Sequence, residues 1–451
     1  MPDLTVTNWF GDLVSHPQAV VEAHSTEDII NVLKNPAKYP SPVRAVGSNH
    51  STARCGAADG GTILKMSGMN KILGITADTV TAQAGAIYVD VAQELEKKQL
   101  QFYVNTEIGS LSVGSAACSG TKDASMPDEF GQVDSYVTNI KMVLPSGELL
   151  EVNEDEFDLL QKVRSSYGTF GIVCEATLRV RAIVPLAVHH QTFAIDEFAE
   201  KLPELKARHE SMMFYSFPHA NLITVEFRKY NPGASGSPNR HIWQLRNYLW
   251  KSAGPLFCRQ VEENIPDPTV RYGVIDDFNA IWRFKLENLV RSDYTIATDQ
   301  IISYPKVADD SRYTFSLWAF PEETYPSVLP EYFRFCQDYY KQKGYRSNML
   351  DVGYRIAKDQ NSLLSYSFDG PVMTIDPVST GNRGWTEFLL AYNQFCSDHA
   401  GIPLFNQTFG VTRAQAQKAF GDRLKLLETT RRAHDPDNRL LNDYFRDLLA
   451  E

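Results

Sequence analysis

The chain lacks several features that would place it in a common class of protein. It has no run of about 18 consecutive apolar residues, so the sequence predicts no membrane-spanning helix. No basic segment followed by an apolar one opens the chain, which argues against a secretory signal. Its 6 cysteines stand singly, with no Cys-x-x-Cys pair and no histidine pairing at zinc-ligand spacing. We therefore expect reduced thiols, no metal site, a cytoplasmic location and no stable membrane insertion.

Two further absences concern the partners of the protein. The formal net charge is -11 and the lysine and arginine residues are scattered, so we expect no basic face and no nucleic-acid partner. No Gly-x-Gly-x-x-Gly motif follows a predicted strand, which argues against a Rossmann nicotinamide site. What remains is a chain of 451 residues with an ordinary hydrophobic content of 43%, long enough for two or three domains with full cores.

A short loop near the N-terminus carries the first functional signal. Residues 44–51 read Arg-Ala-Val-Gly-Ser-Asn-His-Ser, a short apolar strand that turns into small and polar residues. A glycine lets the backbone approach a ligand closely, and the serine, asparagine and main-chain groups are donors of the kind that cradle a pyrophosphate. On these residues alone, a strand-to-turn corner with a satisfied histidine remains an alternative.

A second run of small residues extends from Gly109 to Thr121. Its small residues are close together and do not have the spacing of turns, which indicates that a large, flat group lies against the backbone. A tight helix-packing site is the alternative explanation.

The periodicity of the rest predicts an α+β protein. In the first part of the chain we expect strands at 43–46, 62–66, 80–84, 137–144, 149–152 and 172–180, of which 137–144 and 149–152 form a hairpin, and helices at 29–33, 89–95 and 154–164. Ser25 with Asp28, and Thr412 with Gln415, have the spacing of helix N-caps. From residue 186 aromatic residues become dense, and we expect strands at 223–227, 315–320, 354–357 and 372–375 with helices at 331–343 and 385–399. The basic amphipathic segment 242–251 favours a core-facing helix over a membrane-surface one.

In this order and spacing, five motifs resemble the vanillyl-alcohol oxidase family of FAD-linked oxidases, and within it the aldonolactone and alditol oxidase branch. They are Asn8-Trp9, the loop 44–51, the segment 113–121, the segment 168–177, and Asp435-Pro436 with Asn442-Asp443-Tyr444. The resemblance implies a PCMH-type FAD-binding domain at 1–185, a cap domain at 186–400 with an antiparallel sheet covered by helices, and a C-terminal arm at 401–451 that returns to the first domain.

The resemblance also implies which residues bind FAD. They are Gly47, Ser48, Asn49, His50, Ser51, Gly114, Ser115, Ser119, Gly120, Thr121, Gly171, Val173 and Asn442. In many members of the family the histidine of the first loop is covalently bonded to the flavin, so we expect a bond between His50 and the 8α-methyl group. The alternative is a histidine that only donates or accepts hydrogen bonds. Cys55 and Cys118 do not match the cysteine position of doubly linked relatives, so a single link is favoured.

Two departures from the branch fall on the expected substrate side. Residues 120–123 read Gly-Thr-Lys-Asp where the branch usually has Gly-Thr-His-Gly, and residues 405–408 read Phe-Asn-Gln-Thr where it has His-Trp-x-Lys. The departures argue against assuming a polyol or a sugar lactone as substrate, whereas the FAD motifs are intact.

The resemblance implies an FAD-dependent oxidase or dehydrogenase that takes a hydride from a CH–OH group of a small molecule, with oxygen or another electron acceptor. A C=C reductase using an external nicotinamide and a non-catalytic flavin-binding module are the alternatives. For catalysis we expect Tyr354 at the pocket, Gln407 orienting a substrate oxygen, and Lys122 supplying a positive charge. Arg355 points to the opposite face of the same strand from Tyr354, and a surface ion pair and a functional role are both open for it.

Overall fold

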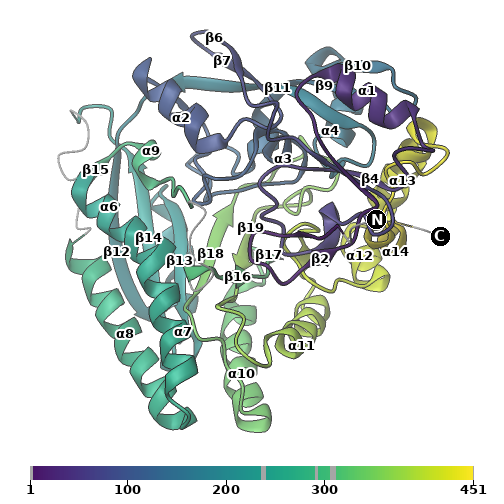
Figure 1. Ribbon diagram of the computed structural model, residues 1–451. Coiled ribbons are helices and arrows are strands. Elements are labelled where there is room, and N and C mark those ends of the chain that lie inside the picture. Colours follow the sequence, from purple (N-terminus) through teal and green to yellow (C-terminus); the bar gives the residue numbers. More distant parts are fainter. Residues whose placement is uncertain (1–3, 235–239, 290–292, 305–310, 450–451) are drawn as a thin grey trace.

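Three β-sheets of three or more strands organise the part of the chain that the computed structural model describes, which comprises residues 4–234, 240–289, 293–304 and 311–449. The chain up to residue 182 holds two of these sheets, and the part from residue 186 on, called the second half below, holds the third (Figure 1). The protein is therefore α+β, as the sequence predicts.

The N-terminal part contains a small parallel sheet and a larger antiparallel one. The parallel sheet has the order β3 (Ala19–Glu22), β5 (Thr62–Lys65), β4 (Val43–Val46). The antiparallel sheet has the order β10 (Leu149–Asn153), β9 (Val137–Val143), β11 (Ile172–Ala182), β7 (Thr79–Gln83), β6 (Ile72–Ile75), and β8 (Leu100–Phe102) also pairs with β11. The predicted hairpin of β9 and β10 is confirmed.

The helices of this part are α1 (Thr26–Lys34), α2 (Tyr88–Lys97), α3 (Val113–Cys118) and α4 (Phe157–Val163). Helix α1 begins after Ser25, whose side chain accepts a hydrogen bond from the backbone N–H of Asp28, and the Asp28 carboxylate accepts from the Ser25 backbone in return. This capping box satisfies two backbone donors that would otherwise lack partners at the helix start. The sequence predicts it at the same residues.

The second half is built on one large antiparallel sheet. Its order is β15 (Asp293–Thr295), β12 (Leu186–Ala194), β14 (Leu222–Tyr230), β13 (Ser211–Phe217), β18 (Asp351–Ile356), β19 (Val372–Ile375), β17 (Trp318–Pro321), β21 (Ile402–Pro403). The helices of this half are α5 (Ile195–Ala207), α6 (Arg240–Tyr248), α7 (Gly254–Asn264), α8 (Pro268–Leu289), α9 (Ala297–Gln300), α10 (Tyr325–Lys343) and α11 (Trp385–Asp398). Figure 1 shows α6, α7 and α8 lying over the strands β12, β14 and β13.

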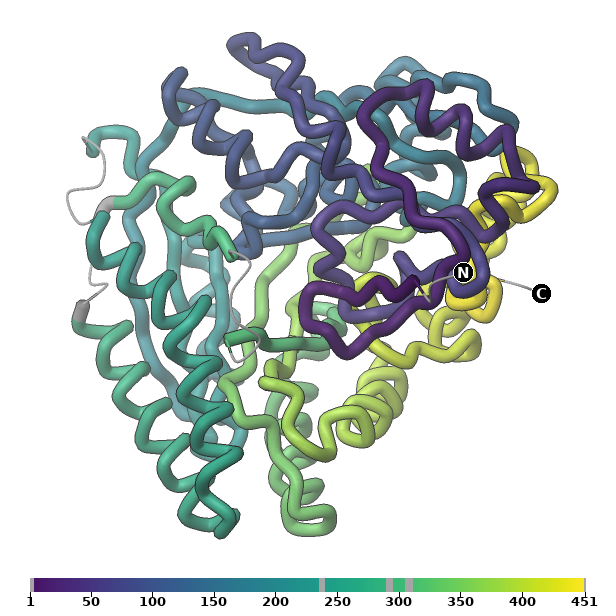
Figure 2. The backbone as a smooth tube through the Cα atoms, in the orientation of Figure 1, coloured from purple at the N-terminus to yellow at the C-terminus, as the bar shows by residue number. Residues whose placement is uncertain are grey.

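The C-terminal segment adds α12 (Arg413–Phe420), α13 (Asp422–His434) and α14 (Asp443–Leu449) and runs beside the N-terminal part, as the purple and yellow tubes of Figure 2 show. Hydrogen bonds join the two ends: the backbone N–H of Val43 donates to the carbonyl of Arg439 at 2.8 Å, and the Arg44 guanidinium donates to the carbonyl of Leu440 at 2.9 Å. The segment after α13 therefore supports β4 and the loop that follows it.

Two predicted elements differ from the structure. The strand predicted at 315–320 is two strands in different sheets, because β16 (Thr314–Phe315) pairs with β20 (Val378–Ser379), whereas β17 pairs with β19 and β21. The helix predicted from 331 begins at Tyr325, since Pro326 is accommodated in the first turn and Pro330 lies inside the helix. The segment 242–251 faces the core, as predicted: Trp243 is 1% exposed.

Candidate active site

A large cavity runs from the N-terminal part to the second-half sheet. It encloses about 1510 Å³ of space between protein atoms, part of it open to solvent. One end is lined by the loop 44–51, by the N-terminal residues of α3 and by the start of β11. The other end is lined by residues of β18 and of the segments that follow β19 and β21. The two regions that the sequence singles out therefore meet at one site.

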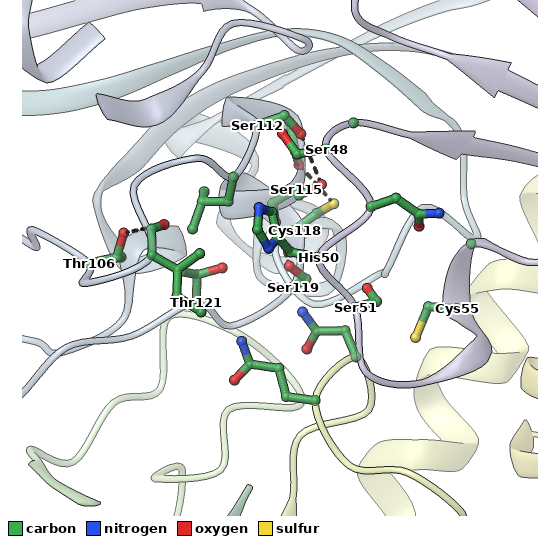
Figure 3. A pocket seen from close by; sticks show the side chains of 18 of the residues that line it. Ser48, His50, Ser51, Cys55, Thr106, Ser112, Ser115, Cys118, Ser119 and Thr121 are labelled. Atoms are coloured by element: carbon green, nitrogen blue, oxygen red, sulfur yellow. Dashed lines mark hydrogen bonds between the residues drawn. The ribbon is translucent and has the colours of Figure 1, made fainter. Parts of the chain in front are cut away.

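The first loop packs tightly against the start of α3. Figure 3 shows Ser48 and His50 beside Ser112 and Ser115. A Cβ atom added to Gly47 would lie 2.6 Å from the Cβ of Ser112, and closer still to its hydroxyl. Ser112 precedes α3 as its N-cap and donates from its hydroxyl to that of Ser115 at 3.0 Å. Only a glycine at position 47 permits this approach, which leaves backbone and hydroxyl donors of both segments lining one cavity.

Most of the residues predicted to contact the cofactor or the substrate line this cavity. They are Gly47, Ser48, Asn49, His50, Ser51, Gly114, Ser115, Ser119, Thr121, Lys122, Gly171, Val173, Tyr354 and Gln407. Gly114 also serves packing, the alternative explanation of the small-residue run, because a Cβ on it would lie 2.7 Å from the Cβ of Ala84. Which of these residues touch FAD stays a prediction.

Two residues predicted to bind the cofactor are not among those that line the cavity. Gly120 has a left-handed backbone, with φ of 62°, and places the residues on either side of it in the cavity wall. Asn442 is buried and its amide donates to the carbonyls of Arg54, Cys55 and Ala57 at 3.0, 3.3 and 2.8 Å. In this structure Asn442 therefore supports the backbone of residues 54–57, which follow the first loop, and does not line the cavity itself.

Aromatic rings surround His50. The indole of Trp9 stacks on the imidazole with ring centroids 4.9 Å apart, and the ring of Tyr304 lies edge-on at 6.4 Å. Burial lowers the pKa of His50 to about 4, because removal from water disfavours the charged imidazolium. The imidazole is therefore neutral at neutral pH and keeps one nitrogen lone pair available.

The cap end of the cavity carries a buried ion pair. The Lys122 ammonium donates to Asp376 Oδ2 at 3.0 Å and lies 3.9 Å from the centre of the Tyr354 ring. The Tyr354 hydroxyl donates to Glu107 Oε2 at 3.1 Å, and burial, followed by the charge of Glu107, raises the pKa of Tyr354 well above 10. Lys122, Asp376, Tyr354 and Glu107 all line the cavity. Tyr354 is thus a neutral phenol that donates a hydrogen bond.

A network of charged groups fixes Glu107 from behind. Arg246 of α6 pairs with Glu107 Oε1 and donates to the Tyr215 hydroxyl at 2.9 Å. That hydroxyl donates to Glu226 at 3.1 Å, and the Arg228 guanidinium donates to Glu226 at 2.6 Å. Buried charges are tolerated when they are paired and hydrogen-bonded in this way. The network therefore holds the wall of the cavity in one arrangement.

The sequence interpretation missed several residues of this wall. They are Glu107, Asp376, Trp250, Tyr313 and Phe315. Asp376 comes directly after the predicted strand 372–375 and before a proline. A charged residue at the end of an apolar strand is the sequence signal that could have marked it as a site residue. The ion pair considered for Arg355 is present, with Glu322 accepting from its guanidinium at 2.7 Å.

The cavity is suited to a large cofactor with a diphosphate. Its N-terminal end offers small residues and hydroxyl donors, and the amide oxygen of Asn406 is buried in its wall without a hydrogen-bond partner among the described residues. No cluster of potential metal ligands and no helix able to cross a membrane is found in the described part of the chain. The described cysteines are free and buried, as predicted.

Comparison with known proteins agrees with this geometry. Residues 17–153 match the family described as FAD binding domain, and residues 176–448 match the family described as D-arabinono-1,4-lactone oxidase. The chain is 22% identical over 450 residues to L-gulono-1,4-lactone dehydrogenase of Mycobacterium tuberculosis, covering 98% of this chain and 99% of that protein. It is 21% identical to L-gulonolactone oxidase of Mus musculus, covering 97% and 96%.

Among solved structures, a cholesterol oxidase from B. sterolicum superposes with a TM-score of 0.71 at 15% identity, covering 99% of this chain and 96% of that one. At this identity the likeness concerns the fold alone. The family match covers more than half of the chain. The chain belongs to the D-arabinono-1,4-lactone oxidase family and is an FAD-dependent oxidoreductase that acts on CH–OH groups.

Proposed function

We propose that the protein oxidises a CH–OH group of a neutral hydroxylated molecule, and that an aldonolactone is the first class to test. The charges at the cap end of the cavity carry this proposal. Lys122 is paired with Asp376, and Glu107 is paired with Arg246. At the opposite end, Arg44 donates to the backbone carbonyls of Cys55 and Tyr167. At the cap end, the cation of the described lining is therefore already paired with a carboxylate and is not free for an anionic substrate, whereas hydroxyl groups find carboxylate, phenol and amide partners there.

The relatives support the same class. They include an L-gulono-1,4-lactone dehydrogenase and an L-gulonolactone oxidase, and also a D-lactate dehydrogenase of Anaerostipes hadrus. Lactate carries a carboxylate and a lactone does not, so the pairing of Lys122 favours the lactone-type relatives. The walls contributed by Trp250, Phe315 and Val378 add apolar surface that suits the ring carbons of a lactone.

FAD bound in this cavity would supply the acceptor of the hydride. The backbone and hydroxyls of 47–51 and of Ser115 would hold its diphosphate, and His50 would hold its ring system. On the substrate side, the Tyr354 oxygen, whose own hydrogen is held by Glu107, would accept from one substrate hydroxyl, and Gln407, whose amide both donates and accepts, would orient another substrate oxygen. The ammonium of Lys122, already directed at Asp376, would keep that carboxylate in place.

We further propose that His50 forms a covalent bond to the 8α-methyl carbon of the flavin. The bond requires a nitrogen lone pair, which the neutral imidazole keeps, and Trp9 stacks on this ring and holds its orientation. The new C–N bond replaces one methyl C–H bond and the imidazole N–H bond, and the two protons and two electrons that are released pass to oxygen or another electron acceptor.

Acid precipitation tests the bond. We expect a yellow pellet from the wild-type protein and a colourless pellet with yellow supernatant from His50→Ala. Trp9→Phe, which keeps a ring against the imidazole, serves as the control and should retain the yellow pellet. A colourless wild-type pellet would show that the histidine only makes non-covalent contacts.

A substrate panel tests the proposed function. Purified protein is mixed without oxygen with D-arabinono-1,4-lactone, L-gulono-1,4-lactone, a polyol, a cyclic alcohol, D-lactate or NADPH, and loss of flavin absorbance is recorded. We expect bleaching by at least one neutral hydroxyl compound and none by D-lactate. Bleaching by D-lactate alone would contradict the neutral-substrate proposal, and bleaching by NADPH alone would favour the reductase.

A further inference from the structure

One carboxylate oxygen in the cavity wall has no partner. Asp376 is 1% exposed and lines the cavity. Its Oδ2 accepts from Lys122 at 3.0 Å, whereas its Oδ1 is buried and makes no hydrogen bond within the described part of the chain. A buried oxygen in this state is costly unless something at the site supplies a donor. The hydroxyl group of a bound substrate is such a donor.

The backbone holds Asp376 rigidly. Its N–H donates to the carbonyl of Val352 at 2.8 Å, and the N–H of Val352 donates back to the carbonyl of Asp376 at 3.0 Å. Pro377 follows in the sequence and restricts the residue before it to an extended conformation. The free oxygen is therefore fixed by its own strand and by Lys122.

The other groups of the wall are less suited to accept a proton. Both oxygens of Glu107 are occupied, one by Arg246 and the other by the Tyr354 hydroxyl. Tyr354 is a protonated donor whose pKa is raised well above 10. Gln407 has no basic group. Of the two carboxylates in the described lining, only Asp376 has a free oxygen.

Resting on the proposed oxidation of a CH–OH group, we propose that Asp376 is the proton acceptor of the reaction and that Lys122 positions it. The substrate O–H bond breaks and its proton goes to Asp376 Oδ1. The C–H bond breaks and the hydride, with its two electrons, goes to the bound cofactor, so that a C=O bond forms. Tyr354 is then a residue that positions the substrate oxygen.

The surroundings of Asp376 make its titration visible. Burial raises its pKa above 3.8, and the nearby charge of Lys122 opposes this rise. The other titratable groups that face it are Tyr354 and Asp351 of β18, Tyr325 of α10, Tyr392 of α11 and Tyr366. Burial raises the pKa of these tyrosines well above 10, so they stay neutral. A base must be ionised to act, and the rate should therefore fall as the pH drops through the pKa of Asp376.

The test measures anaerobic flavin reduction against pH with the panel compound that the wild-type protein oxidises fastest. Asp376→Asn should reduce its flavin about 100- to 10,000-fold more slowly and lose the fall in rate at low pH. Lys122→Met should move that fall to higher pH, because the cation that lowers the pKa is gone. Glu322→Gln is the matched control: it removes a buried carboxylate that is paired with a cation, Arg355, and is not part of the cavity wall, and it should keep the low-pH fall and the rate within about twofold.

A second readout does not depend on turnover. The flavin absorbance of substrate-free protein is titrated with acid: the wild type should show a spectral transition that Asp376→Asn lacks and Lys122→Met shows at higher pH. Flavin content and thermal melting check that each variant is folded. If Asp376→Asn does not fold, Lys122→Met decides the test: a pH profile identical to that of the wild type overturns the inference. Wild-type rates in Asp376→Asn also overturn it. If no panel compound bleaches the wild type, the proposed function fails instead, and the acid titration still decides the inference.

Discussion

Replacing Gly47 by alanine should weaken FAD binding through a steric clash between the new Cβ atom and Ser112. The added Cβ would lie 2.6 Å from the Ser112 Cβ, about 0.8 Å short of ordinary carbon contact, and closer to the Ser112 hydroxyl. Rotating the hydroxyl away does not relieve the contact with Ser112 Cβ, which is fixed to the backbone before α3. The first loop and α3 must therefore separate, and both line the cavity.

Overpacking of this kind costs about 1–3 kcal/mol. If the whole cost falls on the flavin-bound form, the affinity for FAD drops about 5- to 150-fold, because about 1.4 kcal/mol corresponds to tenfold. To keep the covalent bond from hiding the effect, the measurement uses His50→Ala as background and titrates FAD by fluorescence quenching, with and without Gly47→Ala.

Two controls make the geometry testable. Ser112→Gly removes both colliding atoms and should restore affinity in the presence of Gly47→Ala, which gives a coupling energy in the double-mutant cycle. Gly74→Ala, at a glycine with no atom within 4 Å of the added carbon, should leave FAD affinity unchanged. If Gly47→Ala binds FAD as tightly as its background, or if Ser112→Gly gives no rescue, the close approach of loop and helix is not what forms the site.

Two further predictions concern residues around the site. Asn442→Ala removes the amide that donates to the carbonyls of Arg54, Cys55 and Ala57 and should lower the free energy of unfolding by about 1–3 kcal/mol in urea, whereas the exposed Asn264→Ala should change it by less than about 0.5 kcal/mol; equal effects would refute the supporting role. Burial raises the pKa of Asp134 from 3.8 to about 8, so between these pH values the folded protein holds a proton that the unfolded chain has lost. The free energy of unfolding should therefore fall by about 1.4 kcal/mol per pH unit in this range. Urea unfolding at several pH values should show that Asp134→Asn lacks this part of the decline, and parallel pH profiles of the variant and the wild type would refute it.

Much of the N-terminal part could be predicted because its signals are local. The capping box of Ser25 and Asp28, the hairpin of β9 and β10, and the two small-residue segments depend on neighbours in the sequence. The capping box of Thr412 and Gln415 at the start of α12 is confirmed for the same reason. The family followed from the order of five motifs, two of which lie in the small-residue segments. The boundaries at 185 and 400 stay predictions, although β21 (Ile402–Pro403) joins the second-half sheet.

The substrate end could not be predicted in the same way because it is assembled from distant segments. Lys122 meets Asp376 across 254 positions of sequence, and Tyr354 meets Glu107 across 247. No periodicity marks such partners, and Lys122 alone looked like a replacement for a missing positive charge. Similarly, Arg246 seemed part of a basic helix face, whereas it is buried and reaches Glu107.

The crystal structure of the yellow, flavin-containing protein would test the central claim most directly, which is that one cavity holds the cofactor at its N-terminal end and the substrate at its cap end. We expect flavin density that extends from residues 47–51 and Ser115 toward Lys122 and Asp376, with the Asp376 side chain facing the space left for a substrate. Flavin bound outside this cavity, or a cap end closed by side chains with Asp376 turned away, would contradict the account.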